Sequence, residues 1–469
     1  MDYIEKFKNY TTRQTVNLIM KALINTSDEN LIRLTYAAER IAPHYKEEIK
    51  RVRELFQDKA PAYILAQKTL KEIHPNYRDR MVLNFMVNTI LVGSKKRAEF
   101  EKRENSPAPF TIVISPTMRC NLKCADCYAG DYSQEDDLPI ELVDKVVTEA
   151  KEFGTNFFTI SGGEPFVRKD LLDIYQKHND AAFMIYTNGT FIDKDMAKKL
   201  TELGNVAPAI SIEGFEEETD KRRGQGTWKK IMNAMDYLKE EGVIFGFSGT
   251  PTRYNTEVIY SDELIKLLTD KGCVFGWYFT YIPIGRKPNV DLMQTPKQRL
   301  YGWRRVNYLR STYPVFIGDF WNDGMHTEGC IAGGRRYLHI NVHGDIEPCV
   351  FTHFATQNIR NTTLREAMNS PLFRAIRAKQ PYNKNLMLPC MIIDNPEVYQ
   401  EIYNEIKPHP THENAETIFT ECKEHLNKYS KEYEKLSEPF WKKVYENNGE
   451  LPNTIPKKLE EIEQMLEEE

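Results

Sequence analysis

The 469-residue chain lacks three features that would each place it in a large class of proteins. No uninterrupted apolar stretch reaches the roughly 18 residues that a membrane-spanning helix needs. The longest, residues 81–93, is interrupted by Asn84 and Asn88. The net charge of −5, from 63 Lys and Arg against 68 Asp and Glu, excludes a broadly basic nucleic-acid-binding protein. The N-terminus, MDYIEKFKNY, has no apolar signal region, so we expect a cytoplasmic protein.

Cysteine is also sparse, and its placement is uneven. Eight cysteines in so long a chain do not suggest a secreted disulfide scaffold. Three lie within eight positions (Cys120, Cys124, Cys127), three are spread over the later chain (Cys330, Cys349, Cys390), and two stand alone (Cys273, Cys422). In a reducing compartment the tight group predicts a metal site. The two isolated residues are expected to be packing residues.

The hydrophobic pattern predicts four regions, with boundaries where the composition changes. Residues 1–107 have apolar residues at helical spacing and form a helical N-terminal extension. Residues 108–290 alternate short apolar runs with amphipathic helices. Residues 291–395 carry the later cysteines and a predicted hairpin, 337–342 and 346–351, around His343-Gly344-Asp345. Residues 396–469 form a polar helical tail that ends in an amphipathic segment from Leu459 to Leu466.

Six predicted strands in the second region alternate with helices, which predicts an α/β fold with a parallel sheet closed into a partial (β/α)6 barrel. Polar or glycine-containing segments follow each strand, and functional residues in such folds lie at the C-terminal ends of strands. The function is therefore expected at one end of the barrel. The predicted strands are 110–116, 156–161, 182–187, 207–212, 244–248 and 275–283.

Three thiolates at C-x3-C-x2-C spacing after a strand can surround one inorganic centre. Structural zinc normally takes four ligands, and the first histidine downstream is His178. Iron–sulfur clusters are held by cysteine thiolates at such short spacings, and three cysteines on a four-iron cluster leave one iron open to a small molecule. The spacing favours an iron–sulfur cluster over zinc, and it leaves zinc and chance spacing as alternatives.

The cysteine group and Ser161-Gly162-Gly163-Glu164-Pro165 after the next predicted strand together resemble the radical S-adenosylmethionine (SAM) superfamily. The resemblance implies that Cys120, Cys124 and Cys127 bind a 4Fe–4S cluster whose open iron chelates SAM. A deoxyadenosyl radical would then abstract hydrogen from a substrate. The family usually has an aromatic residue before the third cysteine, and this chain has Asp126 there, followed by Tyr128.

The same resemblance implies a SAM pocket. Gly162, Gly163 and Glu164 would meet the methionine ammonium group, because glycine permits close approach of the backbone and a carboxylate accepts charge-assisted bonds. Three further residues match positions that line the pocket in similar proteins: Asn188, Ser211 and Glu213, where the family more often has Asp. Arg222 or Arg223 is a candidate partner of the SAM carboxylate.

The later cysteines resemble the SPASM or twitch extension of some radical SAM enzymes, in a reduced form. This resemblance implies that Cys330, Cys349 and Cys390 hold an auxiliary iron–sulfur cluster, either with an open iron or with a fourth ligand such as His353 or Asp394. Three buried, inert thiols are the alternative.

The substrate is less constrained, because one scaffold serves many reactions. The preferred hypothesis is C–H activation in a lipid or other hydrophobic metabolite, for carbon–carbon bond formation. This hypothesis is based on the apolar stretch 81–92, which is followed by Lys95, Lys96 and Arg97. Such an element could also contact a membrane surface. A buried core helix is the simpler interpretation of the same residues. Modification of a peptide or small polar metabolite is the second hypothesis. A non-catalytic iron–sulfur or zinc protein for electron transfer or regulation is the third. An enzyme would need a reductant such as flavodoxin or ferredoxin, and no nucleic-acid partner is expected.

Overall fold

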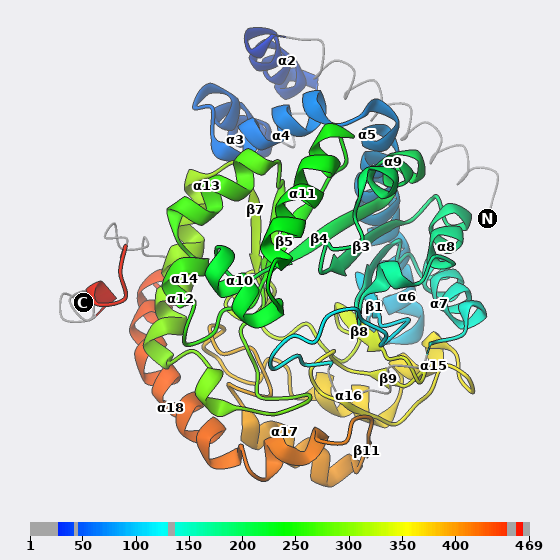
Figure 1. The fold of residues 1–469 in the computed structure, drawn as a ribbon, viewed down its shortest axis with the longest axis vertical. Coiled ribbons are helices and arrows are strands. Elements are labelled where there is room, and N and C mark those ends of the chain that lie inside the picture. The colour runs from blue at the N-terminus through cyan, green and yellow to red at the C-terminus, as the bar shows by residue number, and fades with distance from the viewer. Residues whose placement is uncertain (1–26, 42–45, 130–136, 448–455, 463–469) are drawn as a thin grey trace.

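The computed structural model describes residues 27–41, 46–129, 137–447 and 456–462. A barrel-like sheet with surrounding helices forms the centre of the molecule (Figure 1). The first helices lie at one end of the barrel, and most of the chain after residue 350 lies at the other end (Figure 1). Residues 1–26 and the last residues of the predicted amphipathic tail fall outside the described residues.

Nine strands form one sheet in the order β7-β6-β5-β4-β3-β2-β1-β8-β9. Neighbours from β7 to β8 pair in parallel, and only β9 runs antiparallel to its neighbour β8. The strands are β1 (Thr111–Ile114), β2 (Phe157–Ile160), β3 (Ala182–Thr187), β4 (Val206–Ile212), β5 (Gly246–Gly249), β6 (Phe275–Tyr278), β7 (Phe316–Asp319), β8 (Tyr337–Ile340) and β9 (Ile346–Glu347). The predicted partial barrel is confirmed.

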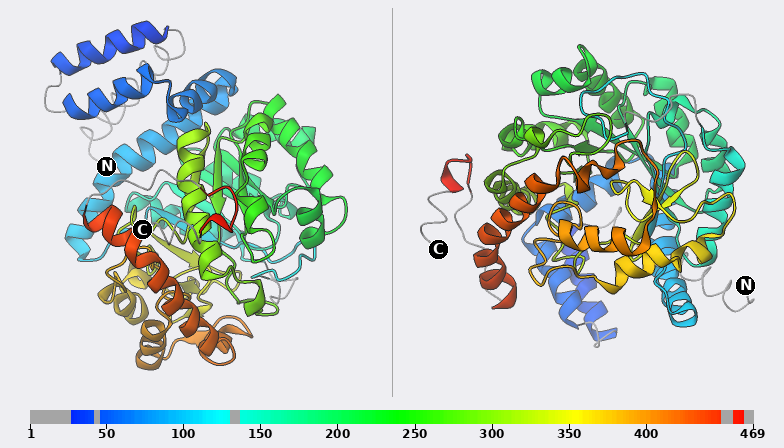
Figure 2. Two further views of the ribbon diagram at one scale, coloured as in Figure 1. Left: turned by 90° about the vertical axis from the view of Figure 1, so that its left-hand side faces the viewer. Right: turned by 90° about the horizontal axis from the view of Figure 1, so that it is seen from below.

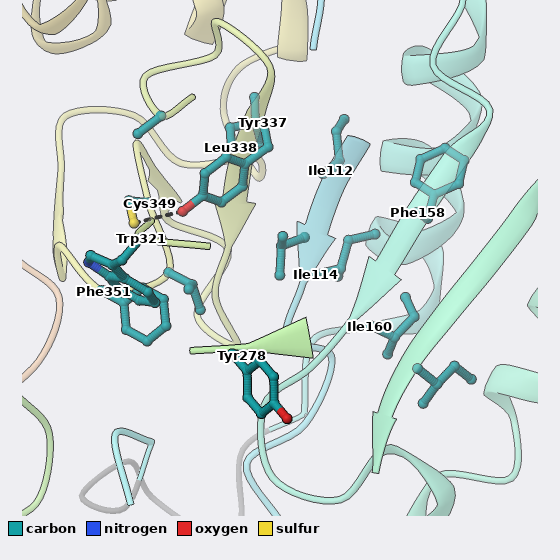
Figure 3. Packing of buried hydrophobic residues seen from close by; sticks show 14 of the residues in the cluster. Ile112, Ile114, Phe158, Ile160, Tyr278, Trp321, Tyr337, Leu338, Cys349 and Phe351 are labelled. Atoms are coloured by element: carbon teal, nitrogen blue, oxygen red, sulfur yellow. Dashed lines mark hydrogen bonds between the residues drawn. The ribbon is translucent and has the colours of Figure 1, made fainter. Parts of the chain in front are cut away.

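The strands present different residues to the two faces of the sheet. The outward face is apolar: Ile112 and Ile114 of β1 and Phe158 and Ile160 of β2 are fully buried in the main core (Figure 3). Burying each such side chain stabilises a fold by about 1.5–3 kcal/mol. The alternate residues face the barrel interior, and they include polar and aromatic side chains that line a cavity.

Helices between the strands cover the outside of the barrel, and the sequence signals their ends. Asp193 accepts a hydrogen bond from Met196 N (2.8 Å) at the start of α9, and Gly204 ends that helix in the left-handed region (φ 70°). These helices are α7 (Ile140–Glu152), α8 (Leu171–Lys177), α9 (Lys194–Leu203), α10 (Glu216–Arg223), α11 (Thr227–Glu240), α12 (Thr256–Ile259), α13 (Asp262–Lys271) and α14 (Pro296–Thr312), with short 3₁₀ turns η3 (Pro165–Val167) and η4 (Val290–Leu292).

The described part of the N-terminal extension is helical, as predicted. It comprises α2 (Asp28–Ile41), α3 (Lys46–Gln57), α4 (Pro61–Glu72), α5 (Pro75–Val82), the π-helical η2 (Leu83–Val92) and α6 (Gly93–Glu104). Hydrogen bonds join this extension to the segments that precede β5 and β6: His74 N donates to Gly242 O (2.9 Å) in the loop before β5, and Lys68 Nζ donates to Thr269 O (2.8 Å) near the end of α13. The extension therefore packs against the N-terminal end of the barrel.

The remaining elements gather beyond the last strands, and α18 runs along one side of the molecule (Figure 2). They are α15 (Leu364–Met368), α16 (Pro371–Ala378), α17 (Pro396–Ile406), α18 (Lys423–Phe440), η5 (Ala415–Phe419), η6 (Trp441–Glu446), and a small sheet of β10 (Phe354–Ala355) and β11 (His409–Pro410).

Two strands of the parallel part of this sheet were not among the predicted six. β7 follows β6 in the sheet, and β8, predicted only as half of a hairpin, pairs in parallel with β1. Both come from the region that was assigned to the auxiliary cysteines, so this region shares a sheet with the barrel. The division into four regions stays a prediction. In the part of the chain that the structure describes, none of the helices has the length and apolar character to cross a membrane.

Candidate functional site

One large cavity, about 1630 Å³, occupies the barrel interior and its C-terminal end. Ligand sites typically occupy about 300–1,000 Å³, so this space has room for more than one ligand. All six cysteines of the two predicted groups line it: Cys120, Cys124, Cys127, Cys330, Cys349 and Cys390. The isolated Cys273 and Cys422 are buried elsewhere, as expected for packing residues.

The first cysteine group lies in the loop after β1, and neighbouring loops fix its position. Ala125 N donates to Arg222 O (2.9 Å) at the end of α10. The Sγ of Cys120 accepts from Leu122 N (3.4 Å) and from Asn188 Nδ2 (3.9 Å). Burial raises the pKa of Cys120 to about 11 and also raises the pKa of Cys127. Because metal ligation requires thiolates, binding a metal centre here releases protons.

The two glycines after β2 lie directly against the cysteine loop. Gly163 N donates to Thr117 O and Glu164 N donates to Arg119 O, both at 2.9 Å. A Cβ on Gly162 would lie 2.4 Å from Thr117 O, and one on Gly163 would lie 2.3 Å from Arg119 O. Both glycines also line the cavity. The sequence predicted that a ligand approaches the backbone closely at these glycines. The structure shows that the backbone of the cysteine loop also approaches these two residues too closely for a side chain.

The Glu164 carboxylate makes its hydrogen bonds within the protein. Its side chain is fully buried and does not line the cavity. One oxygen accepts from Phe166 N (3.1 Å) and Thr187 Oγ1 (2.8 Å), and the other accepts from Asn188 N (2.7 Å). Burial raises the pKa of Glu164 to about 7, against the lowering effect of these donors. In this structure the carboxylate joins the turns after β2 and β3 and so positions Asn188, which lines the cavity.

Glu213 is likewise buried away from the cavity, while Ser211 lines it. Glu213 accepts from Arg222 Nη1 (2.8 Å) and from Arg223 Nε (2.9 Å) and Nη2 (2.6 Å). Both arginines line the cavity near the first cysteine group. Glu213 therefore holds the two guanidinium groups in place at the cavity wall.

The second cysteine group faces the same cavity from three loops: Cys330 precedes β8, Cys349 follows β9, and Cys390 precedes α17. Tyr337 Oη donates to Cys349 Sγ (2.6 Å), a contact visible in Figure 3. Burial raises the pKa of Cys330 and of Cys349, and it raises the pKa of Cys390 to about 12.

The two suggested fourth ligands do not line the cavity. The Asp394 carboxylate is held in a fully buried ion pair with Arg299 and accepts from Cys390 N (2.9 Å). The His353 ring stacks on His412, with 4.9 Å between the ring centres. Both side chains are thus directed to other partners, which argues against either as a ligand.

Sequence reasoning missed a buried hydrogen-bonded series that links the two cysteine regions. His339 on β8 bonds through Nε2 with Ser115 Oγ (2.7 Å), at the start of the first cysteine loop, and through Nδ1 with Glu347 Oε2 (2.5 Å) on β9. All three residues are buried, and none lines the cavity, so their role is to hold the hairpin against the cysteine loop. The parallel pairing of β1 with β8 creates this contact, and no local signal reveals it.

The donor set fits an iron–sulfur cluster at the first group. Three thiols from one loop face the cavity, N–H groups bond to one sulfur, and glycines and Ser211 leave space beside them. In the described ranges of the chain, no group of three or more His, Cys, Asp and Glu side chains is placed to hold a single metal ion.

Comparison with known families matches two segments of the chain. Residues 114–257 match the Radical SAM superfamily, and residues 330–391 match SPASM, an iron–sulfur cluster-binding domain. The first segment contains Cys120 to Cys127 and every predicted pocket residue, and the second contains Cys330, Cys349 and Cys390.

Several characterised proteins are similar in sequence. The Fe-coproporphyrin III synthase of Methanosarcina barkeri is 37% identical over 153 residues, 32% of this chain and 38% of that protein. The AdoMet-dependent heme synthase of Oleidesulfovibrio alaskensis is 26% identical over 313 residues, 60% of this chain and 80% of that protein. The mycofactocin maturase MftC of Mycolicibacterium smegmatis is 28% identical over 296 residues, 58% of this chain and 74% of that protein.

Among solved structures, SuiB of Streptococcus suis bound to S-adenosylmethionine superposes with a TM-score of 0.54 at 20% identity, covering 64% of this chain and 76% of SuiB. SuiB bound to its precursor peptide SuiA gives a TM-score of 0.52 at 19% identity. At this identity the similarity shows the fold alone.

The fold, the cysteine groups and these matches together define a radical SAM enzyme. More particularly, residues 114–257 form a radical SAM segment and residues 330–391 a SPASM segment, and these two segments imply a 4Fe–4S cluster, SAM and additional iron–sulfur centres. The resemblance seen in the sequence is confirmed, and the non-catalytic hypothesis is set aside. Such an enzyme needs a reductant and acts on a substrate.

Proposed function

We propose that the enzyme activates a C–H bond in a large, mainly hydrophobic metabolite, using SAM bound beside Cys120, Cys124 and Cys127. When bound, the cluster and SAM together supply a 5′-deoxyadenosyl radical that abstracts hydrogen from the substrate. The observation that carries the proposal is the single cavity, which joins the cysteines to an extensive aromatic wall. The wall includes Phe85, Phe110, Phe157, Trp277, Phe279, Phe320, Trp321 and Phe351.

In this proposal the three thiolates hold the cluster, and the chain's other residues orient SAM. Gly162, Gly163, Asn188 and Ser211 line the space next to the thiols. Arg222 and Arg223, held by Glu213, provide positive charge for the SAM carboxylate. Tyr128 takes the place of the aromatic residue that is missing at Asp126. Its hydroxyl bonds with Ser161 Oγ (2.7 Å), and its ring lies at the cavity wall.

Cys330, Cys349 and Cys390 are proposed to hold one auxiliary cluster at the other side of the cavity. Three thiols line the wall there, and neither His353 nor Asp394 lines the cavity, so an iron open to the cavity fits this arrangement. The Tyr337 hydroxyl donates to Cys349 and would stabilise its thiolate form.

The relatives support a hydrophobic substrate of substantial size. Two of them are named for heme or coproporphyrin synthesis, and a porphyrin is a large, flat and mainly apolar ring. Within this class we propose a tetrapyrrole-like ring or an acyl chain, with carbon–carbon bond formation as one outcome of the radical step. The electron donor is proposed to be a flavodoxin or ferredoxin and the compartment the cytoplasm, where thiolates stay reduced. Transient contact with a membrane surface stays a prediction.

A peptide is the second candidate, because the similar fold of SuiB accommodates a precursor peptide. Peptide capture by strand addition needs an exposed strand edge. The described part of the N-terminal extension consists of helices, so it offers no such edge for a peptide.

The test is anaerobic incubation of the reconstituted enzyme with SAM and a reductant, in the presence of protoporphyrin IX, palmitate or a short peptide library. We expect 5′-deoxyadenosine release to rise with a hydrophobic acid and deuterium from that compound to appear in deoxyadenosine. If only the peptides increased 5′-deoxyadenosine release, the hydrophobic substrate would be wrong and a peptide would be the better candidate.

A further inference from the structure

The cavity extends through the barrel to the N-terminal ends of the strands. Its lining includes inward residues at successive levels of the same strand, for example Phe157, Thr159 and Ser161 from β2 onward. Beyond Phe157 the lining continues onto Met81 of α5 and Phe85 of η2. From Phe157 to Ser161 the chain rises about 13 Å, at about 3.3 Å per residue. A ligand that reaches both ends must therefore be long or broad.

Aromatic side chains form the wall at this N-terminal end. The rings of Phe85, Phe110 and Phe157 contact one another, with centre-to-centre distances of 5.4 Å, 5.8 Å and 6.4 Å. Met86 and Phe316 also line the cavity and are exposed, at 47% and 57% of their surface. Exposed apolar residues at the edge of an apolar cavity are typical of a ligand-binding mouth.

Two arginines stand at the same end. Arg97 of α6 donates to Gly154 O (2.6 Å) and to Thr89 O (3.1 Å), and its guanidinium lies over the Phe110 ring (5.2 Å). Arg336, just before β8, is exposed, and both arginines line the cavity.

Among the described residues, no carboxylate forms an ion pair with either arginine. Carbonyl oxygens satisfy N–H groups but do not cancel a full positive charge. Burial, together with the nearby charge of Arg336, lowers the pKa of Arg97 to about 10. Two like charges at one apolar mouth are thus left without an internal counter-charge.

We propose that Arg97 and Arg336 form a carboxylate-binding subsite for one end of the substrate. The subsite binds the acidic group or groups of a large apolar acid, whose body lies along Phe85, Phe110 and Phe157. The reacting carbon then lies toward the cysteines at the opposite end of the barrel. Arginine suits this role because its planar guanidinium binds carboxylates through paired, charge-assisted hydrogen bonds.

This inference rests on the proposed function. It adds the direction in which the substrate lies in the cavity and the end of the barrel at which the cavity opens. The substrate's acidic end remains at the N-terminal face of the barrel, next to the helices of the extension. The subsite selects against neutral molecules of similar shape. A bound ester carries no negative charge, so it would leave the guanidinium groups of Arg97 and Arg336 without an anionic partner. Small polar metabolites are disfavoured, because they cannot span the distance between the arginines and the cysteines.

The test is equilibrium dialysis of the full-length, anaerobically reconstituted protein against four probes: palmitate, protoporphyrin IX and the methyl ester of each. Arg97→Gln and Arg336→Gln remove one charge each, and Arg103→Gln is the matched control on α6, outside the cavity lining. Circular dichroism checks folding. Arg336 is exposed, and within the described parts of the chain its side chain forms no hydrogen bond that the substitution would remove.

We expect the wild type to bind at least one acid more tightly than its ester. Each cavity variant should weaken acid binding by about tenfold to a hundredfold, as for loss of a charged hydrogen bond, and leave ester binding unchanged. The acid that shows this preference identifies the source of the carboxylate, an acyl chain or a tetrapyrrole. Arg103→Gln should match the wild type.

Equal binding of acid and ester by the wild type, or an unchanged preference in both cavity variants, would overturn the subsite and leave a hydrophobic substrate standing. Absence of binding for all four probes would overturn the proposed function and the subsite with it.

Discussion

The two ends of the cavity differ in how their charges are balanced. At the C-terminal end, Glu213 pairs with Arg222 and Arg223, and the Glu164 carboxylate accepts three hydrogen bonds. At the N-terminal end, Arg97 donates its hydrogen bonds to carbonyl oxygens among the described residues. The first end is organised by the protein's own residues before a ligand arrives. In the proposed subsite, the ligand supplies the negative charge at the second end. Enzymes that share this scaffold can therefore differ in substrate specificity through the residues at that end.

The largest expected effect follows from removing a thiol at the C-terminal end. Cys124→Ala should abolish 5′-deoxyadenosine formation, because two remaining thiols in this loop cannot retain the proposed SAM-binding cluster. The measurement is deoxyadenosine release by the anaerobically reconstituted enzyme. The control, Cys422→Ala, changes a buried residue outside the cavity and should retain the activity. Normal SAM cleavage by the Cys124 variant would contradict the ligand assignment.

The second largest effect is expected from a substitution that removes the counter-charge of two arginines at the same end of the cavity. Glu213→Gln leaves Arg222 and Arg223 without their carboxylate, and loss of one partner of a buried pair costs about 3–5 kcal/mol. Because both arginines are partly exposed, we expect the lower end of this range in chemical denaturation, together with weaker SAM binding. If stability and SAM affinity were both unchanged, the described role of Glu213 would be wrong.

Cys349→Ala distinguishes the two cysteine groups. Iron content should fall, while the SAM-induced spectral change of the first cluster remains, because the groups belong to separate segments of the chain. Iron analysis and spectroscopy with and without SAM provide the measurement. Unchanged iron would indicate that the later cysteines are inert thiols.

The smallest effect concerns Asp319, a buried carboxylate in the cavity wall at the end of β7. Burial, then the neighbouring charge of Asp323, raises the pKa of Asp319 from 3.8 to about 6. The folded state therefore holds this proton more tightly than the unfolded state, and the wild type loses stability as the pH rises from about 4 to above 6.

Asp319→Asn removes this pH-dependent cost. Its melting temperature relative to the wild type should increase across the same pH range and level off above it. A difference that is independent of pH would show that the carboxylate does not titrate in this range.

Much of the fold could be predicted from local patterns. The six barrel strands were expected within a few residues of their observed positions, and β3 has the predicted bounds. The hairpin around Gly344 was also expected, and β8 pairs with β9 there. β7 was missed because its four residues carry little periodicity, and the pairing of β1 with β8 joins segments more than 220 residues apart.

The candidate site was only partly predictable. The cysteines, the glycines, Asn188 and Ser211 were selected from their positions after strands, and all line the cavity. Glu164 and Glu213 were selected by the same rule, yet their carboxylates are turned into the protein and act through neighbours. Sequence position locates a residue at the end of a strand, but the direction of its side chain depends on which donors surround it.

By itself the sequence determined the class of chemistry, because thiolate spacing and strand-end turns are local properties of the chain. Only the tertiary structure decided that six cysteines share one cavity, that this cavity runs to the opposite end of the barrel, and that Arg97 meets Arg336 there. The physical reason is that a barrel interior is formed by residues from strands far apart in the chain. Its shape and its charge balance exist only once those strands have paired.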